Sequence, residues 1–165
     1  MNNVGILTAQ SRFQDLSAER FDHILINNVT SCFLCCREAI KRMSKGSAIV
    51  NVSSAASRSG APNEYVDYAA SKGAIDTFTK GLSLEVANQG VRVNCVRPGF
   101  IHTEMHIDGG EPKRIERLSS QILLQRGGTP EEVANSILWY LMKPLISLAR
   151  SLTLQVENKS YDLSY

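Results

Sequence analysis

Two short β-branched segments separated by one long helical segment limit the architecture of this chain more than any other feature. "SAIVNVSS" (47–54) and "VRVNCVRPG" (91–99) are typical of buried strands, and residues 64–88 between them have helical periodicity. A helix that connects two strands of one sheet indicates parallel neighbours. A helix predicted over 13–43 precedes the first strand, and another begins at Thr129 and Pro130. The order predicts a single α/β domain with a parallel sheet.

Composition and charge exclude several classes of function. The chain has 165 residues, of which 43% are hydrophobic, and its net charge is +2 without a concentrated basic segment, so nucleic acid is not an expected partner. No apolar run is long enough to cross a membrane and the first residues do not resemble a signal peptide, so we expect a cytoplasmic protein. Three of the four cysteines lie in one helix without a second ligand pair at zinc spacing, so no metal site is predicted.

The stretch "DYAASKGAID" contains a pair of side chains suited to proton transfer. Tyr68 and Lys72 are four residues apart and therefore share one face of a helix. A phenol is a poor acid or base at neutral pH, but a nearby ammonium favours the phenolate, so we expect Lys72 to lower the pKa of Tyr68. Ser54 follows the first strand, at the sheet edge where open α/β sheets bind ligands. Asn28 lies in the first long helix.

Together these motifs resemble the short-chain dehydrogenase/reductase family. The matching segments are "NNVG" for the family's NNAG, the helix Asn28, the strand Ser54, the YxxxK pair and "PGFIHT" for its PG-x-I-x-T turn. The resemblance runs from Met1 to about Leu141 and is most marked to bacterial glucose- and sugar-dehydrogenase-like oxidoreductases. It implies a partial NAD(P)-binding Rossmann fold, the C-terminal half of a doubly wound parallel sheet with flanking helices.

The resemblance also implies a role for each matching residue. Tyr68 would be the general acid or base at the substrate oxygen, Ser54 would hydrogen-bond that oxygen, and Lys72 would lower the pKa of Tyr68 and bind the nicotinamide ribose. Asn28 would hold a water that relays protons from Lys72. The residues expected at the NAD or NADP cofactor are Asn3, Gly5, Tyr68, Lys72, Pro98, Gly99, Ile101 and Thr103. The implied substrate is a small secondary alcohol or carbonyl compound, a sugar or polyol included, and the two long helices, 13–43 and 65–88, would form a homo-oligomer.

The family's Gly-rich phosphate turn between the first strand and the first helix has no counterpart in this chain, which starts inside the family's VNNAG motif. Two functions therefore stay open: an NAD(P)-dependent oxidoreductase, or a catalytically inactive remnant that at most associates with itself. The choice between NAD and NADP also depends on the part of the family pattern that precedes Met1. The excursion 102–128 is interpreted as a loop that forms a mobile substrate lid.

The end of the chain departs from the family. Residues 142–158, read one nucleotide upstream of the printed frame, can encode DEASYLAGAFIDVAGGK followed by a stop codon, which resembles the family's ending. We therefore expect 1–141 to be the family portion and 142–165 to be a frameshift product. The coding DNA tests this, because the codons for residues 155–157 must give Gly-Gly in the shifted frame. Loss of the family's last strand is expected to leave an open edge on the strand 91–99, and the missing N-terminal strands to expose the strand 47–54 on the other side. The segment "LISLARSLTLQV" within the tail is compatible with either a strand or a helix.

Overall fold

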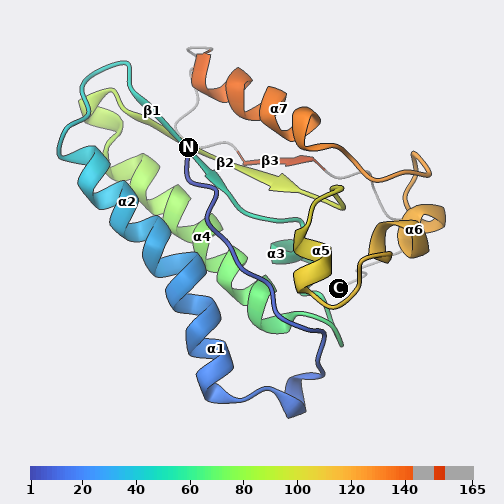
Figure 1. Ribbon diagram of the computed structural model, residues 1–165. Coiled ribbons are helices and arrows are strands. Elements are labelled where there is room, and N and C mark those ends of the chain that lie inside the picture. The colour runs from blue at the N-terminus through green and yellow to red at the C-terminus, as the bar shows by residue number, and fades with distance from the viewer. Residues whose placement is uncertain (143–150, 155–165) are drawn as a thin grey trace, which may run out of the picture.

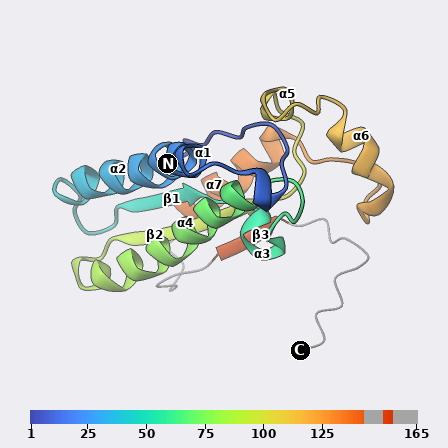
Figure 2. The same ribbon diagram turned by 90° about the horizontal axis from the view of Figure 1, so that it is seen from below.

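The computed structural model describes residues 1–142 and 151–154, and within this part of the chain the secondary structure is of the α/β type. Three strands, β1 (Ala48–Val52), β2 (Arg92–Pro98) and β3 (Ser151–Leu154), form one sheet in the order β1-β2-β3, and both pairings are parallel. Helices lie on both faces of the sheet: α1 (Ala18–Leu25), α2 (Ser31–Ile40) and α4 (Val66–Glu85) lie on one face, and α7 (Pro130–Met142) lies on the other (Figures 1 and 2). The predicted partial doubly wound fold is confirmed.

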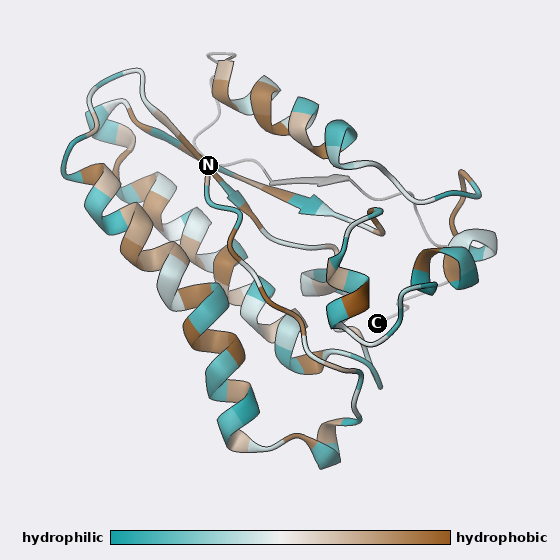
Figure 3. Ribbon diagram, in the orientation of Figure 1, coloured by the Kyte–Doolittle hydropathy of each residue, from teal (hydrophilic) through white to brown (hydrophobic). Residues whose placement is uncertain are grey.

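Alternating side chains of the strands supply two hydrophobic cores. On β1, Ile49 faces one cluster of buried residues, while Val50 and Val52 belong to the other. The first cluster includes Cys32 and Cys36 of α2, and the second includes residues of α7. Successive side chains of a strand point to opposite faces of the sheet, so a strand that is buried on both faces contributes to both cores. Figure 3 shows that β2 is hydrophilic toward its carboxyl end.

The first helical segment is interrupted, where the sequence predicted one continuous α-helix over 13–43. Its parts are α1 (Ala18–Leu25), a π-helical turn (Ile26–Thr30) and α2 (Ser31–Ile40). A short 3-10 helix, Phe13–Asp15, precedes them, and the Ser17 hydroxyl caps α1 by accepting a hydrogen bond from the backbone N–H of Arg20. The π turn is where Asn28 points inward to bond the backbone of another segment, a tertiary contact that periodicity does not report.

The other two long helices agree with the sequence. The helix expected over 64–88 is α4 (Val66–Glu85), followed by a 3-10 turn at Ala87–Gln89. The last helix, α7 (Pro130–Met142), begins with Pro130 in its first position as predicted. Thr129 and Glu132 form a reciprocal capping pair, because the Glu132 backbone N–H donates to Thr129 Oγ1 and the Thr129 backbone N–H donates to the Glu132 carboxylate.

The expectation of an open edge at β2 was wrong, whereas β1 remains an outer strand of the described sheet that meets only a single bridge from Asn2. β3 pairs with β2 in a register that aligns Cys95 with Ser151 and Pro98 with Leu154, so the open choice between strand and helix is settled for 151–154 as a strand. At the other edge the backbone of Asn2 donates to Val50 and accepts from Val52, which begins a parallel pairing with β1. Unpaired backbone groups at an edge readily take up such partners. The rest of the predicted tail, 143–150 and 155–165, lies outside the described residues.

The excursion 102–128, interpreted from sequence as a loop, contains two short helices and a 3-10 turn. These are α5 (Met105–Asp108), α6 (Arg114–Leu118) and Ser119–Gln121, while α3 (Ala56–Ser59) follows β1. Helices of four or five residues carry too little periodicity to be recognised in a sequence. Among residues 1–142 and 151–154, none of the helices combines the length and the hydropathy that a bilayer crossing requires.

Candidate active site

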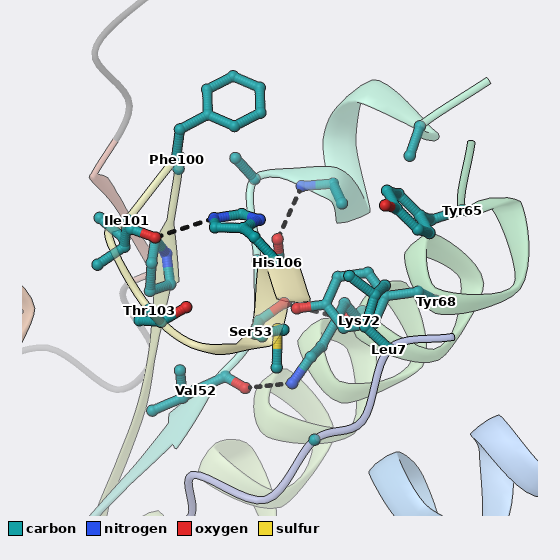
Figure 4. Close-up of a pocket in the computed structure, with 18 of the residues that line it drawn as sticks. Leu7, Val52, Ser53, Tyr65, Tyr68, Lys72, Phe100, Ile101, Thr103 and His106 are labelled. Atoms are coloured by element: carbon teal, nitrogen blue, oxygen red, sulfur yellow. Dashed lines mark hydrogen bonds between the residues drawn. The ribbon is translucent and has the colours of Figure 1, made fainter. Parts of the chain in front are cut away.

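A pocket opens where the carboxyl ends of β1 and β2 meet the start of α4. Its volume is about 670 Å³, and Ser54, Tyr68 and Lys72 all line it. Figure 4 shows Tyr68 and Lys72 reaching into this pocket from α4. The position agrees with the general rule that open α/β sheets bind ligands at the carboxyl ends of their strands. The three residues that the sequence singled out for chemistry therefore share one cavity.

Tyr68 lies in the first turn of α4 and is half-buried, and the Ser54 hydroxyl lies near enough to its hydroxyl to oppose the rise of the Tyr68 pKa. The Ser54 oxygen accepts from the backbone N–H of Ala56 at 3.1 Å, which fixes the side chain and leaves its own proton free to donate. A substrate oxygen placed beside Tyr68 would therefore meet two hydroxyl groups. Such an arrangement can exchange a proton with a carbonyl or alcohol oxygen and stabilise charge on it.

Lys72 is 3% exposed and held by one wall of the pocket. Its ammonium donates to the carbonyl oxygen of Val52 at 3.0 Å and lies 5.5 Å from the centre of the Tyr68 ring. The helix that carries it is tied to the sheet by the Ser53 hydroxyl, which donates to the Lys72 carbonyl at 3.0 Å. Burial lowers the pKa of Lys72 to about 8, an effect that nearby Cys32, Cys95 and Asp76 oppose. The predicted shared face of Tyr68 and Lys72 is confirmed.

The expected lowering of the Tyr68 pKa is not observed. Burial of the hydroxyl raises the pKa of Tyr68, and the nearby Ser54 hydroxyl only partly opposes that rise. The Lys72 charge does not lower the pKa of Tyr68, because the ammonium is directed at the Val52 carbonyl rather than at the phenol oxygen. In this structure Tyr68 is therefore set to hold its proton at neutral pH, which suits proton donation to a carbonyl oxygen.

Asn28 is fully buried behind the pocket and is not among the residues that line it. Its side-chain oxygen accepts from the Ile6 N–H at 2.7 Å, and its amide donates to the Ile6 carbonyl at 3.2 Å and to Ser71 Oγ at 3.0 Å. These three bonds hold the N-terminal segment against α4. Its predicted role in a water relay stays a prediction, whereas its positioning of the backbone near Lys72 is visible.

Gly5 provides the close approach that this packing needs. A Cβ added at Gly5 would lie 3.0 Å from Lys72 Nζ, 3.6 Å from Lys72 Cε and 3.8 Å from Asn28 Oδ1. The absence of a side chain therefore lets the N-terminal segment run directly over the ammonium. The remaining predicted cofactor residues also line the pocket: Asn3, Pro98, Gly99, Ile101 and Thr103. A backbone pairing of Ile101 with Gly128 holds the last part of this wall.

The sequence assigned the excursion to a substrate lid, but it did not identify the residues at the N-cap of α4 and in α5 and α6 that line this side of the pocket. Tyr65, His106 and Arg114 line the cavity, and the Tyr65 hydroxyl donates to the Gly109 carbonyl at 3.2 Å. Further lining residues from the same region are Met105, Arg117, Leu118 and Gln121. The only sequence signal was the pair of arginines three residues apart, 114 and 117, which would share one side of a helical turn.

The residues present fit the nicotinamide half of a dinucleotide. Lys72 supplies a buried ammonium donor, and Gly5 has no side chain that would crowd this ammonium. Thr103, in the segment after β2, adds a hydroxyl to the pocket. A ribose, with its hydroxyl acceptors, matches this set of donors. Among residues 1–142 and 151–154, no Gly-rich turn connects a strand to a following helix in the way that a pyrophosphate cradle requires.

The chain is similar to known oxidoreductases over most of its length. A family described as enoyl-(acyl carrier protein) reductase matches residues 1–157. The chain is 64% identical over 146 residues to the uncharacterised oxidoreductase YgfF of Escherichia coli, which covers 86% of this chain and 59% of that protein. It is 33% identical over 136 residues to a glucose and ribitol dehydrogenase of Daucus carota, covering 82% of this chain and 46% of the relative.

Solved structures agree with the sequence relatives. A short-chain dehydrogenase from Burkholderia cenocepacia in complex with NADP superimposes with a TM-score of 0.83 at 27% identity, covering 94% of this chain and 62% of that one. The chain belongs to the short-chain dehydrogenase/reductase family, and its partial Rossmann fold agrees with this membership. It spans roughly half to three-fifths of the length of the curated relatives that it matches.

Proposed function

We propose that this chain carries the proton-transfer site of an NAD(P)-dependent oxidoreductase that interconverts a small secondary alcohol and the corresponding carbonyl compound. The observation that supports this most is the joint placement of Ser54, Tyr68 and Lys72 on one pocket at the carboxyl ends of the strands. The solved relative from Burkholderia cenocepacia is a complex with NADP, which supports a nicotinamide cofactor without deciding between NAD and NADP.

In this proposal the protein supplies the proton and the alignment. Tyr68 donates its proton to the carbonyl oxygen of the substrate during reduction, and Ser54 donates a hydrogen bond to the same oxygen. Lys72 stabilises the negative charge that forms on Tyr68 and binds the nicotinamide ribose. The bound nicotinamide supplies the hydride that the substrate carbon accepts. Asn28 is a positioning residue, because it touches only the Ile6 backbone and Ser71.

The test is a titration of the purified chain with NADH and with NADPH, followed by nicotinamide fluorescence and then by turnover assays. Saturable binding with turnover that Tyr68→Phe abolishes, while the melting temperature stays unchanged, is the expected result. Absence of binding by either nucleotide would overturn the proposal for this chain and leave the catalytically inactive remnant. Full turnover in Tyr68→Phe would overturn the assignment of the proton donor.

We also propose that the chain forms a homo-oligomer through the helix pair α1–α2 and helix α4. Phe33 stacks edge-on with Phe78 at 6.0 Å between ring centres, yet Phe33, Leu34 and Leu84 all stay exposed. Light scattering on the wild type and on Leu34→Glu tests this, since a charged side chain in an apolar contact should dissociate it. A monomeric wild type would contradict the proposal. The predicted cytoplasmic location stays a prediction.

A further inference from the structure

Tyr68 enters the pocket from the first turn of α4, where backbone N–H groups have no partner within the helix (Figure 4). The N-cap residue, Tyr65, supplies no side-chain bond to these groups. The Tyr68 N–H instead donates to Oδ1 of Asp67 at 2.9 Å. Asp67 is only 1% exposed, although a carboxylate that does no more than cap a helix can do so at the surface. An aspartate is seldom buried this far unless its charge is paired.

The second oxygen of the Asp67 carboxylate pairs with an arginine of another helix. Arg20 Nε lies 2.7 Å from Asp67 Oδ2, and the Arg20 side chain is 21% exposed. Arg20 belongs to α1, which packs beside the start of α4 (Figure 1). One carboxylate therefore joins α1 to the backbone N–H of Tyr68, with one oxygen for each. We call these two residues the Arg20–Asp67 clamp.

The carbonyl of Tyr68 is held from the same helical segment. It accepts from the Ser71 hydroxyl at 2.7 Å, and Ser71 Oγ accepts in turn from the Asn28 amide at 3.0 Å. Asn28 lies in the π-helical turn that follows α1. The backbone groups on both sides of the Tyr68 Cα are thus tied to the first helical segment, which fixes the direction in which the Tyr68 side chain leaves the helix.

We propose that Arg20 and Asp67 are positioning residues that hold the Tyr68 hydroxyl at the point in the pocket where it exchanges a proton. Neither residue is among those that line the pocket, so the clamp acts through Tyr68 and not on the substrate. Proton transfer requires hydrogen-bond distance, so a small displacement of the phenol lowers the rate. The inference deepens the proposed function and rests on it, because it concerns the residue that donates the proton.

Stability alone does not account for this ion pair. The attraction between two buried charges is largely offset by the cost of removing both from water, and well-packed apolar residues are often as stable. Among the described residues, Arg20 Nη2 also finds no hydrogen-bond partner although it is buried, which adds to the cost. What the pair does provide is a single arrangement of the first turn of α4, with the carboxylate between Arg20 and the Tyr68 N–H.

The double variant Arg20→Met with Asp67→Leu separates positioning from stability, because it removes the clamp without leaving a charge buried. We expect its melting temperature to equal or exceed that of the wild type. We expect kcat to fall roughly tenfold while KM changes by less than about twofold, since the phenol is displaced and the residues that line the pocket are intact. A kcat equal to that of the wild type would overturn the inference.

Thr79→Val is the matched control, because it weakens the attachment of the same helix without touching Tyr68. Thr79 is buried, accepts from the Asn51 amide at 2.9 Å and lies about three helical turns after Tyr68. The substitution should lower the melting temperature and leave kcat unchanged. A similar loss of kcat in Thr79→Val would show that any weakening of α4 has this effect, which would overturn the inference.

Arg20→Gln and Arg20→Lys keep the inference testable if the double variant does not fold. Glutamine has no charge to hold the buried Asp67 carboxylate, whereas lysine supplies a point charge. We expect Arg20→Gln to lower kcat with little change in KM, and Arg20→Lys to restore most of the loss. Wild-type kcat in Arg20→Gln would contradict the positioning role.

Tyrosine NMR reports the placement of Tyr68 without requiring turnover. The chain has 5 tyrosines, so ¹³C-tyrosine labelling gives few ring resonances, and Tyr68→Phe identifies those of Tyr68. We expect Arg20→Gln, which changes no sequence neighbour of Tyr68, to shift the Tyr68 ring resonances, and Thr79→Val to leave them in place. Unchanged Tyr68 ring resonances in a folded Arg20→Gln variant would overturn the inference.

The two proposals fail separately. A chain that binds neither NADH nor NADPH, but whose Tyr68 ring resonances shift in Arg20→Gln, would keep the positioning and refute the proposed function. Tyr68-dependent turnover that the double variant retains in full would keep the proposed function and refute the positioning.

Discussion

The ion pair between Arg97 and Asp76 is the contact whose removal we expect to cost this fold most. Arg97 Nε lies 2.7 Å from Asp76 Oδ2, and the two side chains are 6% and 13% exposed. Arg97 is next to the end of β2, and Asp76 lies one helical turn after Lys72, so the pair joins the sheet to α4 beside the pocket. Cys95 also donates its thiol to Asp76 at 3.4 Å.

Asp76→Asn leaves the Arg97 guanidinium buried without a counter-charge. Removing one partner of a buried ion pair costs roughly 3–5 kcal/mol, and we expect about 3 kcal/mol here because part of Asp76 is exposed. For a chain of this length that is a fall in melting temperature of roughly 6–12 °C. Replacing both partners, Arg97→Met with Asp76→Leu, should cost less than Asp76→Asn alone, since no charge is left unpaired.

The effect also has a definite pH dependence. Burial raises the pKa of Asp76, but the hydrogen bond and the positive charge of Arg97, together with the nearby Ser57 and Ser53 hydroxyls, outweigh it, so the pKa lies below its ordinary value. A carboxyl with a lowered folded pKa contributes its stability above the unfolded pKa, near 4, and loses it as the pH falls through the folded value. The gap in stability between wild type and Asp76→Asn should therefore be full at pH 7 and shrink below about pH 4.

Thermal unfolding followed by circular dichroism measures this, with Glu38→Gln as the control. Glu38 makes three ion pairs, with Arg37, Lys41 and Arg42, but all of these side chains are exposed, so we expect no measurable change in melting temperature. A melting temperature of Asp76→Asn within about 2 °C of the wild type would refute the reasoning, as would an equal loss in Glu38→Gln.

Three further predictions concern the pocket. Gly5→Ala places a methyl group 3.0 Å from Lys72 Nζ and should lower kcat/KM roughly tenfold or more. Gly81→Ala is the control, because nothing lies within 4 Å of the added Cβ, and it should leave kcat/KM unchanged. If Gly5→Ala has the same kcat/KM as the wild type, Lys72 tolerates displacement. Asn28→Ala should cost roughly 2–3 kcal/mol in a denaturant titration, because it leaves buried backbone groups unpaired, and a loss under about 0.5 kcal/mol would contradict this. In a spectrophotometric titration, the tyrosinate signal that Tyr68→Phe removes should have its midpoint above about 10, because burial raises that pKa; a midpoint below 9 would instead favour control by Lys72.

The sequence by itself determined the elements and the residues that carry the proposed chemistry. β-branched strands around one long helix require a parallel sheet, and that sheet brings the end of β1 and the start of α4 together, so Ser54, Tyr68 and Lys72 had to be neighbours. The capping pair at Thr129 is equally local, because Glu132 is three residues away.

Only the tertiary structure decided the pKa values of those residues. The pKa of Tyr68 depends on how deeply its hydroxyl is buried and on where the Lys72 ammonium points, and neither is a property of spacing. The interruption of the first helix, the pairing of β3 and the wall formed by α5 and α6 arise from contacts between segments far apart in the chain. The sequence offered only the spacing of Arg114 and Arg117, and the place of His106 and Arg114 in the pocket wall becomes visible only when α4, α5 and α6 pack together.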